Sequence, residues 1–225
     1  GARRTAEELG RAFPSIPVRT SGKDAILDRV PDTAALVIAT PGAEPIADGA
    51  GYGAALLLNS WALLARPELR AAQETLRRWM NAAALVRSAT AGGRVVVLAD
   101  GAMPVVQALL RWSAPWFAER ELDERIEVSF PPAVRMAKLT GSPTALHEFS
   151  GELQLPASAD LLGPVPVAAA GLSVAEQTPQ EQLLIRVPRA DSREFTAALR
   201  VVRAQWSARK APDAIKVEID PYTIG

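Results

Sequence analysis

Short apolar runs alternate with longer amphipathic stretches through the first half of the chain. Unbroken runs of this length are typical of strands buried on both faces of a parallel sheet, and they lie within residues 35–39, 54–58 and 94–100. Residues 67–87 instead repeat apolar side chains at helical spacing, and Pro67 stands at the first-turn position that proline tolerates. Residues 104–111 predict a further helix. Strands and helices that alternate in this way predict a parallel sheet with right-handed crossovers.

Weaker signals add shorter elements to this first part. Thr5 with Glu8 nearly forms a capping box, which predicts a helix start. We also predict a strand over 18–20 and a helix over 22–30. Residues 42–53 are rich in Gly, Pro and Ala, and they predict a loop.

The pattern changes after Phe130, where the order strand, helix, strand occurs twice. The predicted strands and helices cover residues 134–139, 142–152, 161–167, 183–187, 191–206 and 215–219. Prolines within 161–167 favour an edge strand. The order is that of a split βαβ, ferredoxin-like domain. The predicted fold class is therefore α/β, with a parallel-sheet domain at 1–111, a connector at 112–130 and a split-βαβ domain at 131–225.

Apolar stripes and strand ends account for the positions of three of the five tryptophans. We expect Trp61, Trp79 and Trp206 to lie in the core. Trp112 and Trp116 flank the connector, and we expect them to bury the joint between the two parts. Base stacking is the less favoured alternative.

Composition narrows the chemistry that this chain can perform. Of 225 residues, 48% are hydrophobic and 22% charged, and 25 basic residues balance 25 acidic ones. The absence of cysteine excludes disulfides, thiolate zinc sites and cysteine nucleophiles, and His147 is the single histidine. We therefore expect no catalytic residues and no metal site. The chain has no membrane-length apolar run and begins without methionine, so we expect a cytoplasmic protein and a piece of a longer one.

Two segments imitate phosphate-binding motifs. The run 20–23, Thr-Ser-Gly-Lys, ends like a P-loop, but Pro17 replaces the required glycine and Asp24 follows the lysine. Residues 49–53 resemble a dinucleotide fingerprint, but the glycine spacing is wrong and a strand follows the segment rather than preceding it. A solvated lysine and a flexible loop are the favoured interpretations.

Arginines cluster on one predicted helix of the second part. Arg193, Thr196, Arg200 and Arg203 are spaced to share a face away from the apolar stripe of residues 191–206. Further basic residues flank that helix: Arg189, Arg209 and Lys210. Guanidinium groups along one ridge suit phosphates or an acidic peptide tail, while an ordinary solvated face is the alternative. For a second set on the helix at 67–87 we favour the solvated interpretation: Arg66, Arg70, Arg77, Arg78 and Arg87.

Several local signatures occur together in one order along the chain. They are the segments Thr-Ala-Glu-Glu-Leu (5–9), Ala-Thr-Pro-Gly-Ala (39–43), Leu-Arg-Ala-Ala-Gln-Glu (69–74), Phe-Pro-Pro (130–132), Leu-Gly-Pro-Val-Pro (162–166), Ser-Ala-Arg-Lys (207–210) and Val-Glu-Ile-Asp-Pro (217–221). In this combination the chain resembles the C-terminal third of the primosomal protein N′ (PriA) family of bacterial replication-restart DNA helicases, and most closely the actinobacterial form.

The resemblance implies a function for each part. Residues 1–111 would be a partial second RecA-like helicase lobe. The part after Phe130 would be the domain that binds branched DNA and helps to dock the tail of single-stranded DNA-binding protein. Implied partners are forked or single-stranded DNA, that tail and other primosome proteins, with no membrane. The family's ATP, Mg²⁺ and zinc sites belong to upstream regions, so no cofactor is expected in this chain.

Departures from the family pattern affect the motor. The segment around Thr40 lacks the glutamine and the later lysine of active members. Leu85 and Ser88 stand where active members have two arginines, one of which stabilises charge on the transferred phosphoryl group, an effect worth about 10³-fold or more in rate. Arg87 is one residue away, which is about 100° of rotation on a helix. We therefore predict a degenerate helicase motor in a protein that binds forked DNA. The alternatives are an active ATP-dependent 3′–5′ helicase and a protein-interaction module that docks the acidic tail.

Overall fold

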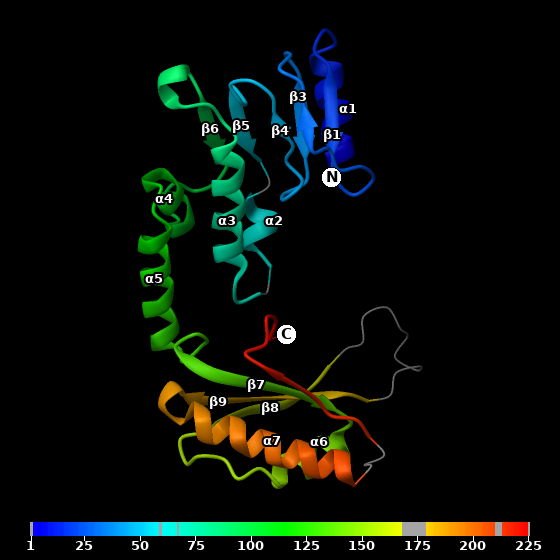
Figure 1. The fold of residues 1–225 in the computed structure, drawn as a ribbon, viewed down its shortest axis with the longest axis vertical. Helices are drawn as coiled ribbons and strands as arrows, with labels where there is room; N and C mark the ends of the chain where they lie inside the picture. Colours follow the sequence, from blue (N-terminus) through cyan, green and yellow to red (C-terminus); the bar gives the residue numbers. More distant parts are fainter. Residues whose placement is uncertain (1, 59, 67, 168–178, 210–212, 225) are drawn as a thin grey trace. The chain divides into compact units, whose positions relative to one another are not determined.

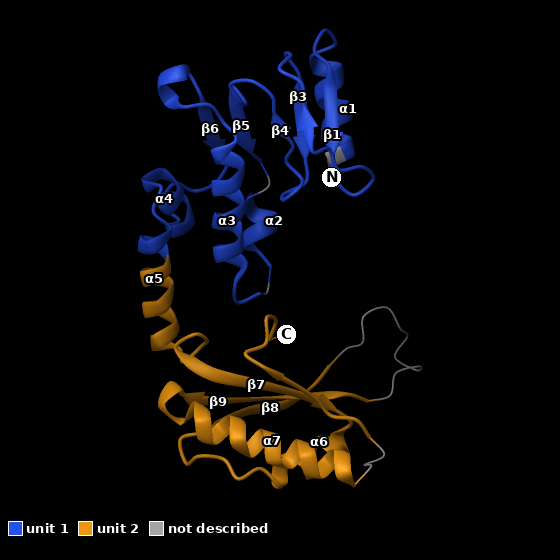
Figure 2. Cartoon of the chain, in the orientation of Figure 1, with its two compact units in different colours: residues 1–117 blue, residues 118–225 orange. Residues whose placement is uncertain are grey.

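A computed structural model describes residues 2–58, 60–66, 68–167, 179–209 and 213–224. The chain forms two compact units, Gly1–Phe117 and Ala118–Gly225 (Figure 2). The division falls inside the segment 112–130 that we predicted as a connector. Within the described residues, no helix combines the length and the apolar character needed to cross a membrane.

The first unit is mixed α/β with small parallel sheets (Figure 1). Its strands pair as β1 with β3, β2 with β4 and β5 with β6, each pair parallel. The elements are α1 (Ala2–Ala12), β1 (Val18–Ser21), β2 (Arg29–Val30), β3 (Leu36–Ala39), β4 (Ile46–Ala47), β5 (Ala54–Leu57), α2 (Ser60–Leu64), α3 (Ala71–Ala84), η1 (Ala89–Ala91), β6 (Arg94–Val97) and α4 (Pro104–Arg111). The parallel pairing and the start of α4 at Pro104 confirm the predicted pattern, while Pro67 lies outside the described residues.

The helix predicted over 22–30 is wrong. The Gly22 amide donates to the Ala25 carbonyl, and the Leu27 amide donates to the Ser21 hydroxyl at 3.0 Å. Hydrogen bonds from a serine side chain to the local backbone compete with a helix, so the segment turns and then enters β2. The loop predicted over 42–53 likewise contains the short strand β4.

The strands of the first unit are less buried than their apolar runs predict. The side chains of β5 alternate between exposed and half-buried, and Leu56 is 60% exposed. The cluster formed by α3, α4 and Phe117 packs against Leu57 and Val97, which lie on the other face of the β5–β6 pair. Trp61 is 74% exposed on the five-residue helix α2, so its predicted core position is also wrong. Trp112 is 54% exposed, so the burial that we expected for this ring is not observed.

The second unit is built on a four-stranded antiparallel sheet. The strand order is β10-β7-β9-β8, so each strand–helix–strand segment has one other strand inserted between its two strands. Both α6 and α7 cover the same face of the sheet (Figure 1). The elements are α5 (Ala114–Glu127), β7 (Val134–Gly141), α6 (Pro143–Gly151), β8 (Asp160–Pro166), β9 (Glu181–Pro188), η3 (Arg189–Asp191), α7 (Ser192–Ala208) and β10 (Lys216–Ile219). The proline-containing strand β8 is at an edge, as predicted.

The core of the second unit lies between the sheet and the two helices. Phe149 of α6 meets Trp206 of α7 edge-on, with ring centroids 5.5 Å apart. Alternate strand residues point to the opposite face, where Lys138 donates to the Thr223 carbonyl at 2.8 Å and Gln182 to the Ile224 carbonyl at 2.6 Å. The residues after β10 therefore run across the face that the helices leave open.

Candidate nucleic-acid interface

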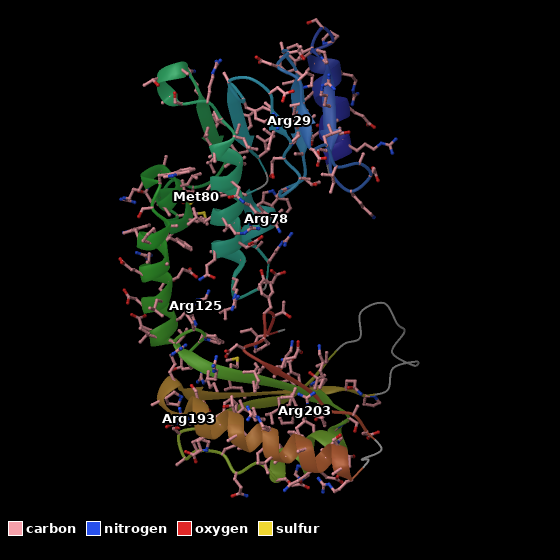
Figure 3. All side chains as sticks on the ribbon, in the orientation of Figure 1. Arg29, Arg78, Met80, Arg125, Arg193 and Arg203 are labelled. Atoms are coloured by element: carbon pink, nitrogen blue, oxygen red, sulfur yellow. The ribbon has the colours of Figure 1, made fainter. Side chains whose placement is uncertain are left out.

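Helix α7 carries three exposed arginines on one flank: Arg193, Arg200 and Arg203. We call these three residues the arginine ridge. At about 100° of rotation per residue, they fall within an arc of about 80° and lie about 120° from the centre of the buried stripe. Figure 3 labels Arg193 near the start of the helix and Arg203 toward its end. In the described part of the chain, none of the three guanidinium groups has a hydrogen bond or an ion pair.

The ridge exists because α7 follows a helical apolar period. Phe195, Leu199, Val202 and Trp206 recur every three or four residues and are buried against the sheet. The residues that α7 places among the arginines are Thr196, Ala204 and Ser207, which are small or polar. The ridge is therefore a row of guanidinium groups with no large apolar side chain of α7 between them.

The flanking basic residues that we predicted are placed differently. Arg189 lies in η3, and its guanidinium donates to the Pro132 carbonyl at 2.9 Å. Arg209 forms two 2.8 Å hydrogen bonds with the carboxylate of Glu152, and its guanidinium lies 5.1 Å from the centroid of the Trp206 ring. The hydrogen bonds to Glu152 raise the pKa of Arg209. Lys210 lies outside the described residues, so the structure brings together three of the six predicted residues.

A groove of about 970 Å³ lies along the other flank of α7. Its centre is about 145° around the helix axis from the arginine ridge. It is lined by Glu152, Gln154, Glu194, Ala197, Ala198, Val201, Val202, Gln205, Ala208 and Arg209. The apolar surface of α7 that solvent can reach is thus separated from the ridge, and Arg209 belongs to the groove.

Two further arginines, which the sequence analysis did not single out, hold the turn before β7. The Arg125 guanidinium is buried, and it donates to the Pro131 carbonyl at 2.8 Å and to Glu121 at 2.9 Å. Arg186 pairs with Asp160 at 2.6 Å and donates to the carbonyls of residues 128 and 129. The available signal was the position of Arg186 inside an apolar strand, where an arginine needs partners.

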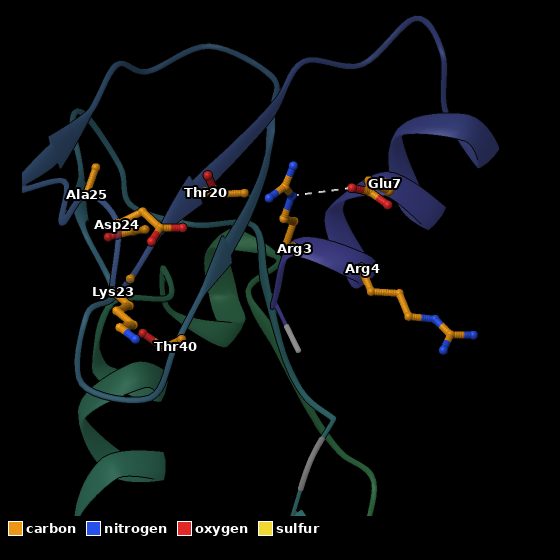
Figure 4. A pocket seen from close by; sticks show the side chains of 10 residues that line it. Arg3, Arg4, Glu7, Thr20, Lys23, Asp24, Ala25 and Thr40 are labelled. Carbon is orange, nitrogen blue, oxygen red and sulfur yellow. Dashed lines mark ion pairs between the residues drawn. The ribbon is translucent and has the colours of Figure 1, made fainter.

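The predicted motor positions lie in the first unit. Thr40 follows β3 and lines a cavity of about 650 Å³ together with Arg3, Lys23 and other residues that Figure 4 labels. Helix α3 ends at Ala84, and Leu85 is its C-cap. Arg87 therefore lies beyond the helix and is not related to Leu85 by helical rotation, and its guanidinium lies beside Gly53 and Gly92. Ser88 accepts a hydrogen bond from the Ala91 amide at 3.3 Å.

Side chains hold the loop that follows Thr40. The Gly42 amide donates to both carboxylate oxygens of Glu44 at 2.9 Å. Ser21 donates to the Ala43 carbonyl at 2.6 Å, and Tyr52 donates to the Pro45 carbonyl at 2.8 Å. Burial, and to a smaller extent the charge of Glu44, raise the pKa of Tyr52. Side chains thus bond four backbone groups of this loop when the contact from Arg78 to the Pro41 carbonyl is included.

The arginines of α3 are engaged within the first unit. Glu74 accepts hydrogen bonds from Arg77 and Arg78 at 2.6–2.8 Å, and these bonds lower its pKa from 4.5 to about 2. Arg78 also donates to the Pro41 carbonyl at 3.3 Å. We favoured a solvated face for these arginines, and the structure adds that Arg77 and Arg78 are paired with Glu74 on the same helix. Within the described ranges, no group of three or more His, Cys, Asp or Glu residues is placed to hold a metal ion.

Comparison with known proteins gives a consistent result. Residues 126–222 match the family described as "Primosomal protein N C-terminal domain". The chain is 50% identical over 230 residues to "Probable replication restart protein PriA" of Mycobacterium leprae, which covers 100% of the chain and 35% of that relative. It is 47% identical over 235 residues to the protein of the same name from Mycobacterium tuberculosis, covering 100% and 36%. The chain spans about a third of the length of these relatives.

Proposed function

We propose, from the premise that this chain is homologous to part of the replication restart protein PriA, that it is a DNA-binding region of such a protein. In this assignment the first unit is a partial RecA-like lobe and the second is a ferredoxin-like domain. The parallel strand pairs support the first assignment, and the strand order β10-β7-β9-β8 supports the second.

The observation that carries the proposal is the arginine ridge. Three guanidinium groups on one rigid helix are exposed and have no partner among the described side chains. Arginine binds phosphate oxygens through parallel N–H donors. Contacts of this kind fix the orientation of a nucleic acid and carry little information about base sequence. They suit recognition of a forked structure, where shape rather than sequence distinguishes the ligand.

An acidic peptide tail is the alternative ligand of the ridge. Peptide recognition usually adds an apolar anchor in a pocket to its charged contacts. On α7 the exposed apolar surface lines the groove on the opposite flank, next to the paired Arg209. A polyphosphate backbone needs no such anchor, because counterion release supplies most of its affinity. The ridge therefore fits DNA better than a tail.

We further propose that the helicase motor is degenerate in this protein. Leucine at position 85 cannot stabilise charge on a phosphoryl group, and the serine at 88 is used as a cap. The decisive measurement is ATP hydrolysis by the full-length protein with and without forked DNA. Hydrolysis stimulated by the fork would establish the alternative, an active ATP-dependent helicase.

The binding proposal is tested by titrating the 225-residue chain with a forked DNA and, separately, with an acidic peptide. We expect fork binding that weakens with added salt, and weaker or absent peptide binding. Reversing charge at Arg193 and Arg200 with glutamate should abolish fork binding. If that variant keeps the fork and loses the peptide, the chain is a protein-interaction module instead.

A further inference from the structure

We infer that the arginine ridge holds a duplex arm of the fork rather than a single strand. This inference rests on the proposed DNA-binding function and names the form of DNA that the site takes. It follows from what surrounds the ridge and from the spacing of its charges.

Proteins that bind single strands usually present aromatic side chains on which the bases stack, and each stacked base contributes about 1–3 kcal/mol. The ridge lacks such a surface. The aromatic residues of α7, Phe195 and Trp206, are in the core, as is Phe149 of α6. Phe130 is half-buried in the turn before β7, and Tyr222 is exposed after β10. Within residues 118–167, 179–209 and 213–224, no Phe, Tyr or Trp is thus exposed on the helices beside the ridge.

Tyr222 belongs to the other side of the sheet. Its neighbour Thr223 accepts a hydrogen bond from Lys138. Lys138 alternates with Ala137 and Leu139, which face the helices. The one exposed aromatic ring among the described residues of this unit is therefore separated from the ridge by the sheet, and bases held there would not be held by the arginines.

The spacing of the three arginines suits duplex DNA, which is stiff and densely charged. At about 1.5 Å of rise per residue, Arg193 and Arg203 are about 15 Å apart along the axis. Duplex DNA carries one charge per about 1.7 Å of its axis with both strands counted, so each strand places about four or five phosphates along that length. One strand therefore offers more phosphates over this length than the ridge has guanidinium groups.

The number of contacts gives a measurable salt dependence. Three phosphate contacts predict a slope of log K against log salt of about −2.7 on a duplex and about −2.1 on a single strand. Between 50 and 200 mM salt, these slopes correspond to a fall of about 40-fold on a duplex and about 18-fold on a single strand that made the same three contacts. Because the ridge has no stacking surface, we expect it to contribute little to single-strand binding.

The experiment compares two probes at a series of salt concentrations with the whole 225-residue chain. One probe is a blunt mixed-sequence duplex of about 20 base pairs, and the other is oligo-dT of the same length. The ridge variant is R193A/R200A/R203A. The control is R19A/R66A/R94A, which removes the same charge from exposed positions of the first unit. Because all six side chains are exposed, circular dichroism and the unfolding temperature should be unchanged.

We expect the ridge variant to lose at least about tenfold in duplex affinity at 50 mM salt. Its slope of log K against log salt on the duplex should be less steep by about 2.7. Its affinity for oligo-dT should change little. The control should retain the duplex slope. If the ridge variant loses both probes equally, or loses oligo-dT more, the ridge binds DNA but does not select duplex, which overturns this inference alone. If neither probe is affected, the DNA-binding role of the ridge is itself wrong.

Discussion

Removing the Arg125 side chain should destabilise the second unit more than any other single arginine substitution on α5. The Arg125 guanidinium is 6% exposed, and it bonds both the Glu121 carboxylate and the Pro131 carbonyl. Substitution with alanine leaves a largely buried carboxylate and a carbonyl without this donor. Breaking a buried ion pair from one side costs about 3–5 kcal/mol. Because the Glu121 side chain keeps 16% exposure, water can reach it, and we expect about 3 kcal/mol.

Two assays measure this loss. One is thermal unfolding of the protein, and the other is hydrogen exchange of peptides from β7 and β9 in the folded protein. For a domain of about 100 residues, 3 kcal/mol corresponds to a fall in Tm of about 12–24 °C. The matched control is R120A on the same helix, whose side chain is 52% exposed and pairs with Glu124. An exposed pair of this kind contributes about 0–1 kcal/mol.

A double-mutant cycle separates the ion pair from the packing of the arginine stem. R125A and E121A should be less costly together than the sum of the two alone, because the second substitution removes the carboxylate that the first leaves unpaired. If R125A costs no more than R120A, or if the two substitutions in the cycle are additive, then the turn at 128–132 does not depend on this buried pair.

Three other outcomes follow from the same geometry. R209A should weaken duplex binding less than R200A in the same titration, because Arg209 is held by a carboxylate and lines the groove; an equal loss would contradict that placement. The pKa of Glu74 is lowered to about 2. The contribution of Glu74 to the free energy of unfolding is therefore present above pH 4.5 and is lost as the pH falls toward 2. Urea titrations of E74Q should lack this loss, and the effect should stay below about 1 kcal/mol because the pair is partly solvated. G51A should destabilise the first unit by about 1–2 kcal/mol in urea titrations, because Gly51 has a φ of +85° and an added Cβ would lie 2.8 Å from the Leu85 carbonyl oxygen. The control G101A, where no atom lies close to the added Cβ, should leave the free energy of unfolding unchanged.

Some features of this protein follow from short stretches of sequence. The stripe of apolar residues on α7 and the prolines in β8 each predicted an element correctly, because the information lies within a few residues of one segment. The same is true of the arginine ridge, since its members share one helix and one period.

The partners of individual side chains could not be predicted in this way. The Arg209–Glu152 pair joins residues 57 positions apart, and so does the bond from Arg189 to the Pro132 carbonyl. Trp61 had the residue type of a core position, but α2 is only five residues long and leaves the ring exposed.

The amino-acid pattern alone therefore determined the type and order of most elements, the edge position of β8 and the face of α7 on which charge gathers. Tertiary structure decided which of the flanking arginines are already engaged, and that the buried Arg125 guanidinium and the half-buried Arg186 hold the backbone at 128–131. It also decided that the groove and the ridge lie on different flanks of α7. The physical reason is that periodicity is a property of neighbours in the chain, whereas burial and pairing depend on what the rest of the fold brings to each side chain.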